Sequence, residues 1–142
     1  MATYSSTKYT NKKAPPGSSH GCAALSLYFE VACAAAPATT DTINFGYVPA
    51  GFRLITAVLE ATDMDTGGPT LTLNVGDAGS ATRIFSASTV AQAGTLSQAL
   101  AVGGSGYQYP AKTLITGVAQ ANATTPAAGT IYLTLIGLVD DV

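Results

Sequence analysis

Charged residues are scarce in this chain of 142 residues: aspartate, glutamate, lysine and arginine together make up 10% of it. An ordinary soluble domain carries about 25%. Hydrophobic residues make up 47%, an ordinary share, so threonine, serine, glycine and alanine replace the missing charge. Free monomers generally rely on interspersed charges for solubility. The composition therefore favours a protein that packs against copies of itself or against a partner. A stable, secreted β protein rich in threonine and serine is the alternative.

Histidine and cysteine are almost absent, so the chain has few side chains that could act as a catalytic base, nucleophile or metal ligand. The single histidine, His20, follows Ser18 and Ser19, but a nucleophilic site also needs a base that a third group orients. Cys22 and Cys33 are too few for a metal set or a disulfide framework. On one extended strand they would lie about 36 Å apart. The sequence therefore predicts no enzyme and no cofactor.

The chain also lacks an apolar run long enough to span a bilayer. Lys12 and Lys13 precede an apolar stretch, and residues 32–36 are small, as at signal-peptide cleavage sites. Glu30 interrupts that stretch, however, and the two lysines lie deep in the chain for a signal sequence. We therefore expect a protein that is made in the cytoplasm, is not processed and has no membrane partner.

Residues 1–20 differ from the rest of the chain in charge and form a predicted extended polar and basic N-terminal arm. They carry three lysines and no acid, whereas residues 21–142 carry three basic residues against eight acidic ones, a balance of −5. The arm has no periodicity and too little apolar area to fold alone. We predict that it binds an acidic surface of a neighbouring subunit or partner through the lysines and two tyrosines, which combine an apolar ring with a polar tip. These residues are Tyr4, Lys8, Tyr9, Lys12 and Lys13.

An unattached tail is the alternative interpretation of the same segment. Three lysines with no basic patch around them do not indicate nucleic-acid binding.

Residues 51–77 contain the clearest β pattern of the chain. A first run, residues 52–62, is rich in branched and apolar side chains, and in a second run, residues 70–75, leucine and valine alternate with threonine and asparagine. This period of two places the apolar side chains on one face of a sheet. The connecting residues 63–69 contain two glycines and a proline, which favour a turn. The pattern predicts one long β-hairpin.

Shorter turn-bounded segments predict six further strands. They cover residues 25–31, 41–48, 82–86, 96–102, 113–119 and 130–139. With the hairpin, this gives about eight short strands and no convincing helix. Such spacing is typical of a β-sandwich or barrel, and a jelly roll is the eight-stranded solution. We therefore predict an all-β protein with a single jelly-roll-like β-sandwich over residues 21–142.

Asp63 and Asp65 resemble the opening of a calcium-binding loop. A complete loop of this kind needs a further ligand at its fifth position and a bidentate glutamate at its twelfth. Those positions hold Gly67 and Asn74. Aspartate and glycine are also the residues that tight turns prefer. We interpret the segment as a turn and keep Asp63 and Asp65 as a weak candidate cation site.

Five segments between residues 45 and 138 carry a resemblance to a known group of proteins. They are Val48-Pro49-Ala50-Gly51, Asp63-Met64-Asp65-Thr66-Gly67-Gly68, Leu71-Thr72-Leu73-Asn74-Val75-Gly76, Gly103-Gly104-Ser105-Gly106-Tyr107-Gln108-Tyr109 and Ala128-Gly129-Thr130-Ile131-Tyr132-Leu133. These segments are similar to those of small virion proteins of tailed bacteriophages, the cement or decoration proteins.

The resemblance implies a jelly-roll-like sandwich that binds the outside of an icosahedral capsid and staples neighbouring capsomers. Its partners would be the major capsid protein and other copies of the chain, in a homodimer or homotrimer, with no nucleic acid, membrane, cofactor or catalytic residue. The predicted arm carries no motif of this group. Two alternatives remain open: a tail or head-fibre module, and a carbohydrate-binding adhesive β-sandwich.

Overall fold

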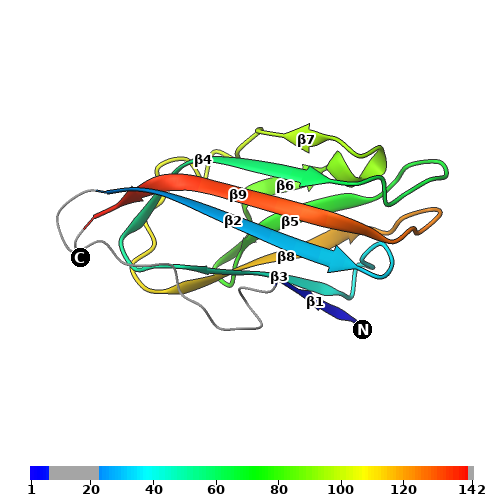
Figure 1. Cartoon of the computed structure of the whole chain (residues 1–142), viewed down its shortest axis with the longest axis horizontal. Coiled ribbons are helices and arrows are strands. Elements are labelled where there is room, and N and C mark those ends of the chain that lie inside the picture. Colours follow the sequence, from blue (N-terminus) through cyan, green and yellow to red (C-terminus); the bar gives the residue numbers. More distant parts are fainter. Residues whose placement is uncertain (7–22, 141–142) are drawn as a thin grey trace.

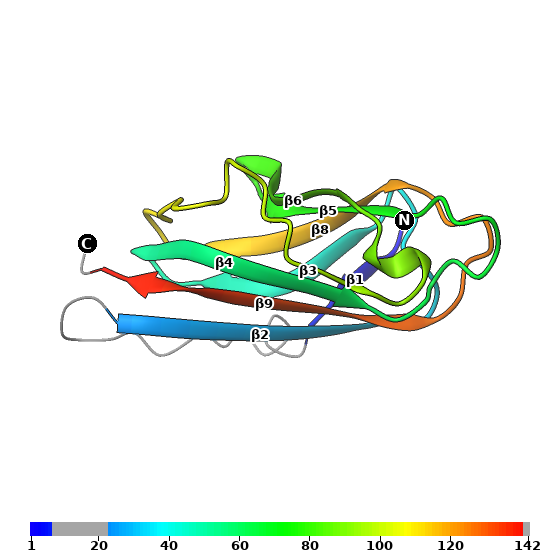
Figure 2. The same cartoon turned by 90° about the horizontal axis from the view of Figure 1, so that it is seen from above.

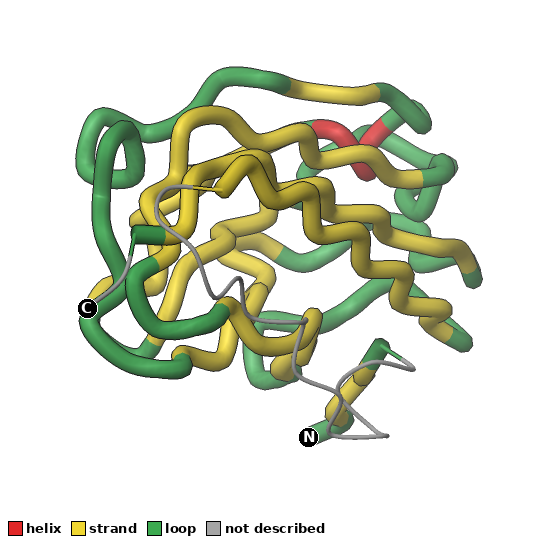
Figure 3. The backbone as a smooth tube through the Cα atoms, turned by 60° about the vertical axis from the view of Figure 1, so that its left-hand side comes forward, coloured by secondary structure: helices red, strands yellow, loops and turns green. Residues whose placement is uncertain are grey.

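The computed structural model describes residues 1–6 and 23–140, whose strands form two sheets packed face to face (Figures 1 and 2). The strands are β1 (Thr3–Ser5), β2 (Ala23–Cys33), β3 (Thr42–Val48), β4 (Phe52–Ala61), β5 (Thr72–Asp77), β6 (Ser80–Ser88), β7 (Leu96–Ser97), β8 (Thr113–Ala121) and β9 (Gly129–Val139). One short 3-10 turn, η1 (Val90–Gln92), is the helical element of these residues (Figure 3). The predicted all-β sandwich is confirmed.

The order of the strands defines a jelly roll. One sheet has the order β1-β3-β8-β5-β6 and the other the order β2-β9-β4-β7. Four antiparallel pairs are nested in the sequence: β5 with β6, β4 with β7, β3 with β8 and β2 with β9. The chain is therefore one long antiparallel ribbon, folded back at Ala78-Gly79 and rolled into two sheets, as in other eight-stranded jelly rolls. The ninth strand, β1, runs parallel to β3 at the edge of its sheet.

The predicted hairpin over residues 51–77 is wrong in its pairing. Both of its strands exist, but β4 pairs with β9 and β7, whereas β5 pairs with β8 and β6 in the other sheet. Figure 2 shows β4 and β5 in separate layers, with the chain crossing between the sheets after β4. A period of two reports which side chains face the core, not which strand lies alongside. The turn that does close a hairpin is the next one, Ala78-Gly79.

The segment between β6 and β8 is mostly irregular, as the sequence predicts. β7 begins at Leu96, where a strand is expected, but it ends after two residues. No helix in residues 1–6 and 23–140 is long and apolar enough to cross a membrane.

The core lies between the sheets and follows from alternation along each strand. On β9, Ile131, Leu133 and Leu135 are completely buried, and the residues between them face outward. Phe45 of β3 and Phe52 of β4 are also completely buried, and they come from opposite sheets. Burying a large apolar side chain contributes about 1.5–3 kcal/mol, so this layer provides most of the drive to fold.

Gly137 of β9 occupies a position that has no room for a side chain. It pairs with Leu25 of β2 on one side and with Leu54 of β4 on the other, beside a bulge in β4. A Cβ atom at this position would overlap the backbone oxygen of Arg53 and lie 2.7 Å from the Phe52 ring. Because backbone cannot rotate away as a flexible side chain can, a methyl group here would push β4 away from β9.

We predict that Gly137→Ala lowers the free energy of unfolding by about 2 kcal/mol or more, as overpacked core positions do. Urea unfolding followed by circular dichroism measures the change. Gly68→Ala is the matched control, since no atom lies within 4 Å of the added Cβ atom. Equal stability of the two variants would contradict the tight contact between β4 and β9.

Candidate interaction surfaces

The first described residues of the predicted arm are attached to the sandwich. Ala2 donates its backbone N–H to Asp41 at 2.6 Å, and Ser6 donates its backbone N–H to the carbonyl oxygen of Asn44 at 2.8 Å. Hydrogen bonds from the backbone N–H groups of Ala38 and Ala2 lower the pKa of the Asp41 carboxyl. Asp41 therefore stays ionised and holds β1 along the edge of β3.

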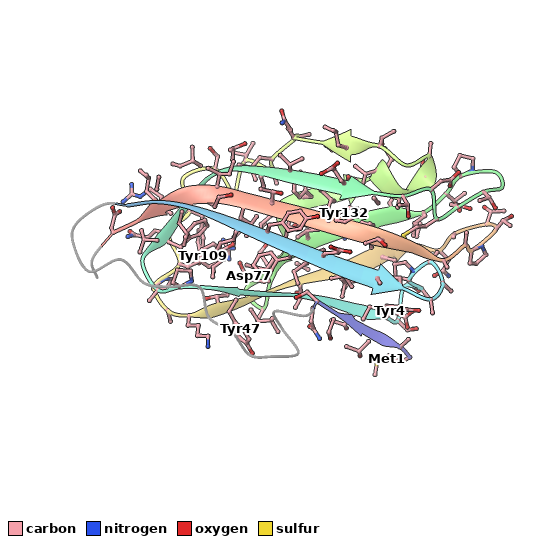
Figure 4. All side chains as sticks on the ribbon, viewed as in Figure 1. Met1, Tyr4, Tyr47, Asp77, Tyr109 and Tyr132 are labelled. Carbon is pink, nitrogen blue, oxygen red and sulfur yellow. The ribbon has the colours of Figure 1, made fainter. Side chains whose placement is uncertain are left out.

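Tyr4 is the only predicted contact residue among the described residues. It lies on β1 (Figure 4), is half-buried and packs against the core of its own chain. Lys8, Tyr9, Lys12 and Lys13 lie outside the described residues, as do His20 and Cys22. Tyr4 therefore belongs to the sandwich edge, where the residue remains partly accessible.

Cys33 is a free, buried thiol at the end of β2. Burial raises the pKa of this thiol to about 11, with the nearby Asp41 carboxylate acting in the same direction. The neutral thiol is unreactive and packs as a small apolar residue.

Asp65, one of the two candidate cation ligands, is buried and uses both carboxylate oxygens within the chain. Oδ2 accepts the backbone N–H groups of Thr70 at 2.7 Å and Leu71 at 3.0 Å. Oδ1 accepts those of Thr124 at 2.9 Å and Thr125 at 3.0 Å. The four donors come from two loops, β4–β5 and β8–β9, so Asp65 ties these loops together at one end of the sandwich.

The other candidate ligand, Asp63, is exposed and accepts the backbone N–H of Asp65 at 3.1 Å, which is a local turn contact. The described residues contain no group of three or more histidine, cysteine, aspartate or glutamate side chains that could hold a metal ion. The hydrogen bond from Thr125, with those from Thr70, Leu71 and Thr124, lowers the pKa of the Asp65 carboxyl, although burial acts in the opposite direction. The aspartates therefore build the loop.

A second buried carboxylate, Asp77, fixes the opposite end of the sandwich. Its Oδ2 atom lies 2.5 Å from Nε of Arg83, and the Arg83 guanidinium lies 3.7 Å from the centre of the Tyr107 ring. Tyr107 in turn meets Tyr109 edge to face, with ring centres 4.9 Å apart. Asp77 and Tyr109 appear near each other in Figure 4, and burial raises the pKa of the Tyr109 hydroxyl. This cluster joins the β5–β6 hairpin to the loop before β8.

The outer face of the sheet β2-β9-β4-β7 is the most apolar surface of the described chain. Four of the six exposed large apolar side chains lie on this sheet, and none lies on β3, β8, β5 or β6. They are Tyr28 (46% exposed), Ile55 (50%), Leu96 (59%) and Ile136 (40%). Tyr28, Ile136 and Ile55 lie on the adjacent strands β2, β9 and β4, and contiguous exposed apolar patches mark contact sites.

Two glutamates flank one member of an aromatic pair on this surface. Tyr28 of β2 stacks on Tyr132 of β9, with ring centres 6.1 Å apart and planes inclined by 22°. In register, Glu30 of β2 and Glu60 of β4 lie on either side of Tyr132. We call Tyr28, Glu30, Glu60 and Tyr132 the tyrosine face. The alternation along residues 25–31 indicates that Tyr28 and Glu30 point outward, but no local pattern places residues 60 and 132 beside them.

Comparison with known proteins places this arrangement in a class. No protein-family model and no curated protein matches the sequence. A chain of the capsid asymmetric unit of cyanophage Pam1 is 40% identical, with a TM-score of 0.76 over 89% of this chain and 92% of that chain. A chain of the capsid of Ralstonia phage GP4 is 27% identical, with a TM-score of 0.82 over 99% of each chain.

The jelly roll and these similarities define a structural component of a phage capsid. The chain belongs to the same family as the Pam1 capsid chain. The resemblance to virion proteins is therefore confirmed at the level of the capsid.

We predict that Asp65→Asn lowers the melting temperature by about 5 °C or more, because an amide cannot accept four N–H groups and brings its own donors against them. Asp63→Asn is the matched control, because its side-chain oxygen still accepts the N–H of Asp65. Equal melting temperatures of the two variants would contradict the loop-tying role.

The pH dependence provides a second measurement on the same pair. Because the pKa of Asp65 is lowered in the folded chain, its contribution is complete above the unfolded value of about 3.9. It is lost as the pH falls through the folded value. Stability of Asp65→Asn should therefore fall less steeply on acidification than that of Asp63→Asn. Parallel curves would contradict the assignment.

Proposed function

We propose that this capsid component is a cement, or decoration, protein. It binds the outer surface of an icosahedral phage capsid and staples neighbouring capsomers. Its partners are the major capsid protein and further copies of itself, as a homodimer or homotrimer, and it is made in the host cytoplasm.

The observation that carries the proposal is the near-complete alignment of this chain with chains of two phage capsids. The aligned part covers 92% of one of those chains and 99% of the other. Those capsid chains are therefore small single sandwiches as well. A small sandwich attached to a shell acts through the area that it buries across junctions, on the order of 800 Å² per partner. The accessible surface here is 6572 Å², which leaves room for several such contacts.

Symmetric repetition supports the same role. Once one copy is attached to a shell, each further contact of that copy is effectively intramolecular, so weak contacts combine into strong attachment. The low charge of the chain, 10% of residues, is compatible with a surface that is largely covered in the particle.

We further propose that the N-terminal arm contributes some of these contacts through Tyr4, Lys8, Tyr9, Lys12 and Lys13. Tyr4 starts from a fixed position on β1, at the edge of the five-stranded sheet. Contacts that begin at a fixed strand cost less conformational entropy than contacts of a free tail.

The experiment is to add purified chain to capsids that lack it and to measure occupancy by sedimentation and cryo-electron microscopy. Substituting Lys8, Tyr9, Lys12 and Lys13 by alanine should weaken binding on the order of tenfold or more, with an unchanged β spectrum. Deleting the whole arm is a poorer test, because it also removes β1. Thr10→Ala/Asn11→Ala is the control within the same segment. Unchanged occupancy of the four-residue variant would contradict the role of the arm, and failure of the wild-type chain to bind would contradict the cement function.

A further inference from the structure

The tyrosine face carries acidic charge that the described part of the chain does not neutralise. Glu30 and Glu60 form no ion pair with the described residues, whose two salt bridges are Arg53–Asp140 and Arg83–Asp77. The third described cation, Lys112, lies over the ring of Tyr47. The face therefore presents two carboxylates on either side of Tyr132, on which Tyr28 stacks, and no basic side chain of the sandwich is left for them.

This combination of groups fits a lysine side chain. An ammonium group gains from a carboxylate and from the face of an aromatic ring beside it. The chain already uses this contact twice: Arg83 lies 3.7 Å from the centre of the Tyr107 ring, and Lys112 lies 4.6 Å from that of Tyr47. The stacked pair Tyr28 and Tyr132 offers the same surface with stronger negative charge beside it.

The negative charge of the glutamates also disfavours the same face of a second copy as the occupant. If two copies met face to face, the glutamates of one would approach those of the other, and like charges in contact weaken an interface. The occupant must therefore be basic, and the remaining cations of the chain are Lys8, Lys12 and Lys13.

We propose that the tyrosine face is the binding site for residues 7–13 of a neighbouring copy. The inference rests on the proposed function, since it supplies the contact between copies on the capsid. Along an extended segment, Lys8 and Lys12 are about 13 Å apart at 3.3 Å per residue. Glu30 and Glu60 lie two strand spacings apart across the sheet, about 10 Å. A segment that crosses the strands brings each lysine to one glutamate, and Tyr132 lies between the two glutamates.

The contact joins different surfaces of the two copies. Each copy offers one basic segment and one acidic face, so a closed ring of copies satisfies every site, and an open chain leaves one of each unused. This favours a closed oligomer and excludes an interface built only from the sheet faces.

A charge-swap experiment tests the proposal on the full-length chain. Glu30→Lys/Glu60→Lys places lysines on the face, and Lys8→Glu/Lys12→Glu/Lys13→Glu places acids on the arm. Self-association is measured by sedimentation velocity at low salt, since exposed charge contacts weaken at high ionic strength. Each variant alone should associate at least about tenfold more weakly than the wild-type chain. Their equimolar mixture should recover association in open chains and in rings with an even number of copies, because alternating variants bring every arm to a face of opposite charge.

Two controls separate the proposal from its alternatives. Thr116→Lys/Gln120→Lys adds lysines to β8 in the other sheet and should leave association unchanged. A single chain with all five substitutions should also associate, since it restores opposite charges. If neither the mixture nor this chain recovers association, the lysines and glutamates do not pair and the neighbour contact is wrong.

The outcome is distinct from that of the capsid experiment. If neither charge variant changes self-association while the wild-type chain decorates capsids, the tyrosine face is not the site and the cement function stands. If the swap behaves as expected and the chain does not bind capsids, the contact between copies stands and the cement function is wrong.

Discussion

The register of β9 between β2 and β4 is the constraint on which the rest of the structure depends. With a period of two, the strand buries Ile131, Leu133 and Leu135 and turns Tyr132 outward. A slip of one residue would exchange these sets, exposing the core and burying the tyrosine. Gly137 holds the register, because β4 approaches too closely there for any side chain. The core and the tyrosine face are thus two sides of one strand, fixed by the same pairing.

Strands were predictable from the sequence because alternation is a local signal, whereas partners were not, because jelly-roll pairing is nested. The runs that become β4 and β5 were identified at nearly their observed bounds, but β4 pairs with the distant β9, and β5 pairs with the distant β8 as well as with the adjacent β6. Asp65 was interpreted as part of a hairpin turn, but its segment crosses from one sheet to the other. Two of the N–H groups that it accepts come from Thr124 and Thr125, some 60 residues away, and no spacing rule reports such a contact. The pairing of Tyr28 with Tyr132 was hidden for the same reason.

Four of the eight acidic residues hold elements of the fold together. Asp41 holds β1, Asp65 joins two loops, and Asp77 fixes Arg83 at the hairpin. Asp140 pairs with Arg53. Each of these acids is committed to backbone or side-chain partners within the chain, where a hydrogen bond to a charged group is worth more than one between neutral groups.

Glu30 and Glu60 differ from these acids because they form no ion pair with the described residues. This difference supports a binding role for the outer face. They lie on the sheet that also exposes Tyr28 and Ile136, whereas the opposite sheet exposes no large apolar side chain among its described residues. A solvent-facing sheet gains nothing from combining apolar exposure with unpaired charge of one sign, since the first lowers solubility and the second repels. When a basic segment covers the sheet, both features stabilise the contact. The tyrosine rings provide buried contact area, and the carboxylates orient the bound segment.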